Sequence, residues 1–378
     1  MSGSQHLVVG AGLAGAATAW RLAERGHEVT LVERTEPAAP DGSSHGSARI
    51  FRYAYHERDY VELAVRAAAA FRELERLHGA PLLTPAPALD HGPGRDPRAL
   101  ARVLQDVGVE HELLGAAEAR ARWPQLVVDG EVLHQPSGAV IDAEGTVRAM
   151  VDLARAAGAR VLTGWPLVHL ERTATGFTAF STAGRALDAG HVVVAAGGWL
   201  PDLLGGLPLP AGFLAAFPAL HVLQENAFHF PYREQHPHGT WPTVIHEVPE
   251  ILVYALPGGR DAGFRGQKVA EYAGGRPLAS AAGQSGAVDA ANRTRVSGYV
   301  RRYLPGLVPE PYAETTCLFT STPTEDFVVD GADGITVLSA CSGHGAKFAP
   351  LLGEIAADVA TGGTPPQRFR VGAARPGP

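Results

Sequence analysis

The chain has 378 residues, of which 46% are hydrophobic and 19% charged, enough for two domains with separate cores. The net charge is −7 and the basic residues are dispersed, which argues against nucleic acid or an anionic membrane as a partner. The sequence has two cysteines, Cys317 and Cys341, and lacks a basic, apolar leader at its start. We therefore expect a cytoplasmic protein without a disulfide framework.

The first quarter of the chain has the hydrophobic pattern of a βαβ unit followed by a long helix. The patterns predict a strand over 6–10, a helix over 13–25, a strand over 28–33 and an amphipathic helix over 60–77. Proline and glycine are then frequent between residues 80 and 94. This shift in composition suggests an exit from a first domain.

The alternation of predicted strands and helices returns later in the chain, so the two domains are expected to be interleaved. Elements are predicted as a helix over 146–157, strands over 160–163, 191–196 and 335–340, and helices over 289–303 and 343–360. Residues 219–272 are β-like with many turns. We expect one nucleotide-binding domain from 1–80, 140–215 and 317–378, and a second domain from 81–139 and 216–316.

A glycine motif lies between the first predicted strand and helix. Gly10, Gly12 and Gly15 form G-x-G-x-x-G. The first glycine allows a tight turn, the second lets a pyrophosphate approach the helix N-terminus, and the third allows close helix packing. Glu33 ends the second strand, where a carboxylate can bind ribose hydroxyls. The motif predicts an adenine-dinucleotide site, with a simple packing turn as the alternative, and does not separate FAD from NAD.

A polar run, GSSHGSARIFRYAY, follows at residues 42–55. Ser44 or Ser47 is predicted to cap a helix, which would place Arg49 and Arg52 on one helix face. Two guanidiniums there could stabilise an anionic reduced cofactor or clamp a substrate carboxylate. A surface ion pair is the alternative interpretation of the same spacing.

Four segments together resemble the monomeric sarcosine oxidase and N-methyltryptophan oxidase family. They are the glycine motif with Glu33, SSHGSARIFRYAY, TTCLFTSTPTEDFVVD and SACSGHGAKFAP. The resemblance extends over nearly the whole chain. It implies an α/β fold in which a Rossmann-like FAD-binding domain is interleaved with an α+β substrate domain that contains an antiparallel sheet. It also implies oxidation of the C–N bond of a secondary amine or imino/amino acid by oxygen, giving an imine and hydrogen peroxide.

The resemblance implies roles for several residues. Cys317 matches the family's flavin-linking cysteine, which implies 8α-S-cysteinyl FAD; a cysteine considered alone would be a small buried hydrophobe, the only interpretation for Cys341. Arg52 and Lys347 would hold the substrate carboxylate. Lys268 matches the lysine that stabilises superoxide when oxygen is reduced, although on its own it would be a solvated lysine.

The remaining implied site residues surround the flavin and the substrate. Arg49 and His45 would tune the flavin, and Tyr254 matches an active-site tyrosine. Tyr272 stands where sarcosine oxidase has a histidine, which favours a bulkier or cyclic substrate, such as an imino acid or an N-methyl amino acid. Cofactor contacts are also expected from Ser44, Gly343 and Gly345. The histidine spacings fit no standard metal-ligand set, so no metal is expected.

Two alternatives keep part of this interpretation. One is an FAD-dependent dehydrogenase of a hydroxy or amino acid that uses an acceptor other than oxygen. The other is a nucleotide-binding scaffold without catalytic activity. The preferred interpretation is a monomeric, cytoplasmic enzyme whose partners are a small amine and molecular oxygen.

Overall fold

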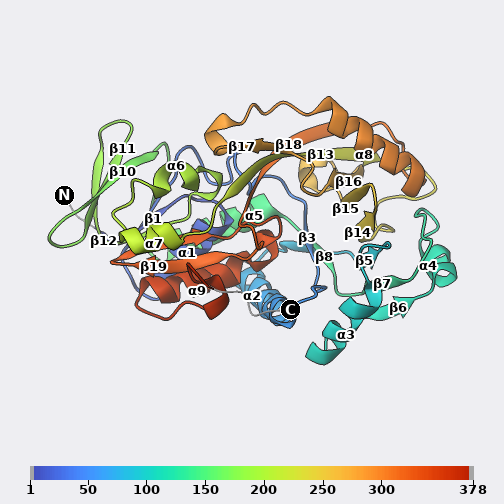
Figure 1. The fold of residues 1–378 in the computed structure, drawn as a ribbon, viewed down its shortest axis with the longest axis horizontal. Helices are drawn as coiled ribbons and strands as arrows, with labels where there is room; N and C mark the ends of the chain where they lie inside the picture. The colour runs from blue at the N-terminus through green and yellow to red at the C-terminus, as the bar shows by residue number, and fades with distance from the viewer. Residues whose placement is uncertain (1–3, 374–378) are drawn as a thin grey trace.

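The computed structural model describes residues 4–373, which form two large β-sheets, one small sheet and surrounding helices (Figure 1). The first sheet has eight strands, the second has nine and the small sheet has three. Parallel and antiparallel sheets thus occur together, as the predicted α/β fold requires. The predicted division into two discontinuous domains, with its boundaries, stays a prediction.

The first sheet has a parallel centre. β1 (Ser4–Val9) lies between β2 (Val29–Val32) and β12 (Ala186–Val194), and all three run in the same direction. β9 (Arg160–Leu162) continues the sheet beyond β2, and β20 (Ile335–Ser339) pairs in parallel with β12. Three antiparallel strands complete it, namely β10 (Leu167–Arg172), β11 (Phe177–Ser181) and β19 (Val328–Ala332). The carboxyl ends of the parallel strands therefore meet at one edge.

Helices cover both faces of this sheet. α1 (Leu13–Glu24), α5 (Ala143–Ala156) and α9 (Ala349–Ala360) pack on the face to which Val8 points. Small residues let them approach, because a Cβ on Gly353 of α9 would lie 2.3 Å from the Cβ of Ala17 in α1. α2 (Arg58–His78) packs on α9. The opposite face of the sheet is covered by α6 (Leu200–Leu204) and α7 (Ala211–Ala216).

The second sheet is mostly antiparallel. β13 (His221–Pro231) pairs with β18 (Ala313–Ser321) on one side and with β16 (Gly266–Glu271) and β17 (Arg276–Leu278) on the other. Beyond β16 the strand order is β15 (Ile251–Pro257), β14 (Thr243–Val248), β5 (Ala88–His91), β7 (Val132–Gln135) and β6 (Glu112–Leu114). α8 (Ala290–Tyr303) covers one face, where it packs against Phe228 and Phe230. The other face is left to line a cavity.

The far end of the second sheet carries α3 (Pro97–Val107) and α4 (Ala116–Arg122), which lie beside β6 and β7 in Figure 1. Short 3₁₀ turns connect several elements, at Gly197–Trp199, Arg260–Ala262, Ala281–Gly283, Gly345–Phe348 and Gln367–Phe369. Among residues 4–373, no helix has both the length and the apolar character needed to cross a bilayer.

The small sheet corrects one prediction. β3 (Arg49–Phe51), β8 (Ala139–Ile141) and β4 (Leu83–Pro85) form it, with β8 in the middle. The helix predicted after Ser44 or Ser47 is therefore wrong. Ile50 and Phe51 favour extended backbone, and pairing with β8 satisfies their peptide groups while Phe51 enters the core.

The last predicted helix, over 343–360, also needs correction. A 3₁₀ turn forms first and α9 begins only at Ala349. Ser342 and Gly343 have φ values of 40° and 70°, which a right-handed helix does not allow. The other predicted helices correspond to α1, α2, α5 and α8, with ends that differ by a few residues.

Candidate functional site

A cavity of about 780 Å³ begins at the carboxyl ends of β1, β2, β12 and β20 and continues along the face of the second sheet that α8 leaves open. Most of the predicted site residues line this cavity, namely Gly10, Gly12, Glu33, Ser44, Arg49, Arg52, Tyr254, Lys268, Tyr272, Cys317, Gly343, Gly345 and Lys347. Gly15 and His45 do not line it. The structure thus brings together residues that are separated by more than 300 positions in the sequence.

The glycine turn between β1 and α1 has the geometry that its motif predicts. Gly10 has φ +98°, and a Cβ there would lie 2.5 Å from the carbonyl oxygen of Ala195. A Cβ on Gly15 would lie 1.9 Å from the Gly10 carbonyl oxygen, so the helix can approach the strand only with glycine. Gly15 therefore acts through packing, behind the cavity wall.

Two side chains satisfy donors at the start of α1. The Ala11 amide donates to Glu33 Oε2 (2.7 Å), and the Leu13 amide donates to Ser44 Oγ (3.0 Å). Ser44 thus caps α1 rather than a helix of its own, and the missing side chain of Gly12 leaves room for it. The helix N-terminus, the carboxylate at the end of β2 and the bare glycine backbone fit a dinucleotide.

Arg52 and Lys347 converge on one aromatic ring. The Arg52 guanidinium lies 5.2 Å and the Lys347 ammonium 5.1 Å from the centroid of the Tyr55 ring. Lys347 Nζ also donates to the Tyr55 hydroxyl (2.7 Å) and to the carbonyl of His344 (3.3 Å). Lys347 is only 4% exposed, and burial together with the charge of Arg52 holds its pKa well below the usual value.

A series of hydrogen bonds fixes the protonation states of Tyr55 and His344 beside Lys347. Because the Tyr55 oxygen accepts from Lys347, its O–H is free to donate to His344 Nδ1 at 3.0 Å. His344 Nε2–H then donates to the Glu325 carbonyl at 3.0 Å. Burial and the nearby Lys347 lower the pKa of His344 to about 3, so its imidazole is neutral, as these hydrogen bonds require.

A buried carboxylate, Asp90, anchors two guanidiniums at the same end of the cavity. Arg95 donates to Asp90 Oδ1 at 2.7 Å, and Arg52 lies 3.8 Å from the same oxygen. Gln135 donates to Asp90 Oδ2 at 3.0 Å and accepts from the amides of Tyr53 and Ala54. Asp90 on β5 thus helps to hold Arg52, and the surface ion pair considered for Arg52 is excluded because Asp90 is fully buried.

Arg49 is held by backbone instead of by a carboxylate. It donates to the carbonyls of Ala48 (2.9 Å), Ser43 (3.0 Å) and His45 (2.9 Å), and forms no ion pair within residues 4–373. His45 lies behind the cavity wall, where burial and the charges of Arg49 and Lys268 lower its pKa to about 4. Its Nε2 is buried without a hydrogen-bond partner. The structure thus places a fixed positive charge beside the cavity.

Lys268 extends from β16 into the cavity and is 5% exposed. Its Nζ donates to the carbonyl of Ala48 at 3.3 Å. Burial and then the charge of Arg49 lower the pKa of Lys268 to about 7, against smaller opposite effects of Cys317 and Asp261. The solvated lysine considered from the sequence is therefore excluded.

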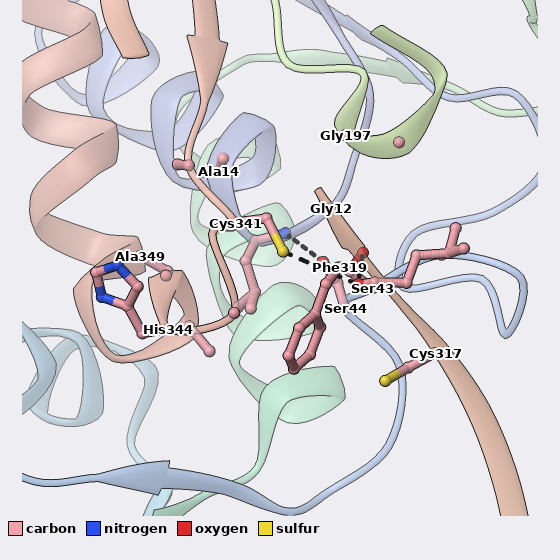
Figure 2. Close-up of a pocket in the computed structure, with 18 of the residues that line it drawn as sticks. Gly12, Ala14, Ser43, Ser44, Gly197, Cys317, Phe319, Cys341, His344 and Ala349 are labelled. Carbon is pink, nitrogen blue, oxygen red and sulfur yellow. Dashed lines mark hydrogen bonds between the residues drawn. The ribbon is translucent and has the colours of Figure 1, made fainter. Parts of the chain in front are cut away.

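Both cysteines line the cavity and both are free thiols (Figure 2). Cys317 lies on β18, and Cys341 on the loop that follows β20. The Cys341 sulfur accepts from the Thr320 amide (3.4 Å) and donates to the Leu318 carbonyl (3.9 Å), so it links the loop to β18. The expectation that Cys341 is only a buried filler was incomplete.

The loop after β20 needs glycine for two reasons. A Cβ on Gly343 would lie 2.9 Å from the Tyr272 ring, and a Cβ on Gly345 would lie 1.6 Å from the carbonyl oxygen of Ala340. Tyr272 in turn donates to Glu325 Oε1 at 2.8 Å, and its ring lies 5.7 Å from that of Phe319. The loop is thereby packed against the aromatic part of the cavity.

Sequence reasoning missed several side chains of this region. Tyr55 was noted only as part of a motif, Asp90 lies in the segment interpreted as a domain exit, and Arg95 directly follows that segment. None of them carries a local signal, because their function depends on contacts with residues distant in the chain. Among residues 4–373, no cluster of three or more metal-ligating side chains is arranged to hold a metal ion.

The glycine turn and the carboxylate of Glu33 fit a dinucleotide-binding enzyme, and the cations Arg52 and Lys347 line the same cavity. The model of the FAD-dependent oxidoreductase family, DAO, matches residues 5–359. The chain belongs to this family. FAD rather than NAD is therefore the dinucleotide, which resolves the alternative that the glycine motif left open.

Similar proteins span almost the same length. Monomeric sarcosine oxidase of Bacillus sp. (strain NS-129) is 29% identical over 367 residues, covering 94% of this chain and 92% of the relative. N-methyl-L-tryptophan oxidase of Yersinia pestis (strain Pestoides F) is 29% identical over 362 residues, covering 93% of each. The structure of NikD, an unusual amino acid oxidase essential for nikkomycin biosynthesis, superposes with a TM-score of 0.83 at 27% identity and covers 96% of this chain and 95% of NikD. The predicted family, fold class and FAD-dependent amine oxidase class are confirmed.

Proposed function

We propose that this enzyme oxidises the C–N bond of a secondary amine that carries a carboxylate, such as an N-methyl or cyclic amino acid, with oxygen as the acceptor. The products would be an imine and hydrogen peroxide. One observation carries the proposal: Arg52 and Lys347 converge beside Tyr55, in the cavity that begins at the dinucleotide-binding turn. The names of the relatives, which are oxidases of sarcosine and of an N-methyl amino acid, support the substrate class.

The substrate carboxylate would bind between the Arg52 guanidinium and the Lys347 ammonium. A carboxylate entering this buried corner would restore to Lys347 the charged state that burial and Arg52 disfavour. The same cations disfavour an ammonium group nearby, so the site would select the neutral amine, whose lone pair is needed for oxidation. No separate general base is then required.

The wall beside this corner fits an apolar substrate body. Ile245, Leu252 and Tyr254 line the cavity from β14 and β15, and the rings of Phe319 and Tyr272 line it too. Tyr254 is partly buried, and burial of its hydroxyl keeps its pKa far above the usual value, so the hydroxyl stays neutral. A substrate with a ring or a hydrophobic side chain would bury apolar surface here.

FAD, when bound, supplies the two-electron acceptor for the amine. Lys268 and Arg49 would then supply positive charge on the cavity wall, where electron transfer to oxygen creates negative charge. Lys268 has no ion-pair partner within residues 4–373, so negative charge that forms nearby would favour its protonated state, which burial disfavours.

Cys317 would hold FAD covalently. It projects from β18 into the cavity, where burial raises the pKa of its thiol above the usual value and the charges of Arg49 and Lys268 partly offset that effect. The cytoplasmic location and the monomeric state stay predictions.

A peroxide-coupled screen tests the proposal. N-methyl, cyclic and primary amino acids of both configurations would be supplied to the purified holoenzyme, and hydrogen peroxide would be measured. We expect turnover with N-methyl or cyclic amino acids and none with the matching amines that lack a carboxylate. Flavin reduction without peroxide, rescued by an artificial quinone, would support the dehydrogenase alternative. Equal rates with and without a carboxylate would contradict the role of Arg52 and Lys347.

A further inference from the structure

A buried carboxylic acid stands directly opposite Cys317. β13 and β18 pair antiparallel, and Glu225 is the register partner of Cys317. Side chains directly opposite on antiparallel strands share one face of the sheet, with their Cβ atoms about 4.5–5.5 Å apart. Because the Cys317 side chain lines the cavity, Glu225 lies on that same face, next to the thiol.

Glu225 is buried without a cation. It is 1% exposed, and within residues 4–373 it forms no ion pair. Its Oε1 is buried without a hydrogen-bond partner. A buried carboxyl oxygen that accepts no hydrogen bond is unfavourable for folding, so its presence calls for another explanation.

The surroundings of Glu225 make its carboxyl a proton acceptor near neutral pH. Burial, and to a lesser extent the charge of Glu271 on β16, raise its pKa to about 7, against opposite effects of the Gly275 and Gly274 backbone. The other titratable groups that face it are the thiol of Cys317 on β18 and the phenol of Tyr254 on β15. A base whose pKa lies near the working pH is the most effective for removing a proton.

Other candidate acceptors are less well placed for the Cys317 proton. Lys268 lies on β16, which β13 separates from β18, and its register partner on β13 is His229, four residues along the strand from Glu225. Arg49 is always protonated. Tyr254 and Cys341 both have raised pKa values, so they keep their own protons at neutral pH.

We propose that the Glu225 carboxylate accepts the thiol proton of Cys317 when the enzyme attaches FAD, an inference that rests on the proposed covalent bond. The S–H bond breaks and its proton moves to Glu225, while a C–S bond forms at the 8-methyl carbon of the flavin, which loses one hydrogen. The two electrons released pass to the ring and from there to one molecule of oxygen, which leaves with two protons as hydrogen peroxide. Glu225 is then free to give up its proton.

The inference is tested on the full-length chain produced without flavin, to which FAD is added. Covalent attachment is followed by the flavin that stays with the protein after acid precipitation. We expect Glu225→Gln to slow attachment at pH 7.5 by about 100-fold or more, while FAD still binds non-covalently. Raising the pH to 10 should shrink the difference, because hydroxide then deprotonates the thiol. Glu314→Gln, which changes an exposed carboxylate on β18, the strand that carries Cys317, is the matched control and should attach FAD at the wild-type rate.

A second measurement does not depend on flavin. In a Cys341→Ser background, alkylation of Cys317 should follow the titration of Glu225 in the wild type and shift to higher pH in Glu225→Gln. Glu225→Asp keeps the carboxylate, so it should retain the pH profile at a lower rate, which separates proton transfer from loss of folding.

The outcomes separate the two proposals. If the wild-type protein releases all its flavin on precipitation, the covalent attachment is wrong and this inference fails with it. If wild type and Glu225→Gln attach FAD at equal rates at pH 7.5, only the role of Glu225 is overturned. The same holds if Lys268→Met, and not Glu225→Gln, removes the pH dependence.

Discussion

Replacing Lys268 with methionine should stabilise the fold and at the same time slow the reaction with oxygen. Methionine is similar in length to lysine but carries no charge. It would therefore fill the space of the Lys268 side chain without burying an ammonium group. A residue retained for stability would show the opposite pattern. The combination therefore tests whether Lys268 is present for function.

The size of the stability change follows from the pKa of Lys268. Burial lowers it from 10.5 to about 7, and each tenfold change in proton affinity corresponds to about 1.4 kcal/mol, which gives about 5 kcal/mol as an upper value. Below pH 7 the lysine is charged in both the folded and the unfolded chain, so the full penalty applies. Between pH 7 and 10.5 only the unfolded chain stays protonated, so the penalty decreases as pH rises.

The expected gain in unfolding free energy for Lys268→Met is thus about 5 kcal/mol at pH 6 and about 2 kcal/mol at pH 9. Urea unfolding of both holoenzymes at the two pH values measures it. In stopped-flow experiments, anaerobic reduction by substrate should be nearly unchanged, whereas reoxidation should slow by about 100-fold or more.

Lys347→Met is the matched control, since it also removes a buried lysine from the same cavity. It should stabilise the fold but weaken substrate binding, and leave reoxidation unchanged. The reasoning would be refuted if Lys268→Met destabilised the protein at pH 6, or if it reoxidised at the wild-type rate.

Four further predictions follow from the site. Cys317→Ser should release FAD into the supernatant after acid precipitation although the native protein stays yellow; flavin retained in the pellet would contradict the tether. Arg52→Lys keeps the charge but loses the paired donors, so steady-state kinetics should show KM raised about 10-fold or more with a smaller change in kcat. Tyr55→Phe removes the oxygen that accepts from Lys347, so thermal unfolding should show a loss of about 1 kcal/mol and kinetics a higher KM. Asp90→Asn leaves buried guanidiniums without their anion, and a loss of about 3–5 kcal/mol in urea unfolding is expected; an unchanged midpoint would exclude a structural role.

The sequence by itself determined the features that depend on neighbouring residues. The glycine motif places Gly10 and Gly15 at positions where only glycine fits, and a strand and a helix flank it because their hydrophobic periods are local. The motifs around Arg52, Cys317 and Lys347 pointed to one family, which the family match confirms. These signals can be recognised without a structure because each lies within one short, continuous segment of the chain.

Only the tertiary structure decided which side chains meet. Ser44 caps α1 from 31 residues away, and the segment that follows Ser44 becomes β3 instead of the predicted helix. Asp90 meets Arg52, and Glu225 stands opposite Cys317, through strand pairings whose register no local pattern encodes. Burial then shifts the proton affinities of Lys268 and Glu225, and burial exists only once the two sheets enclose the cavity. Chemistry that depends on desolvation and on contacts across strands is therefore a property of the folded chain.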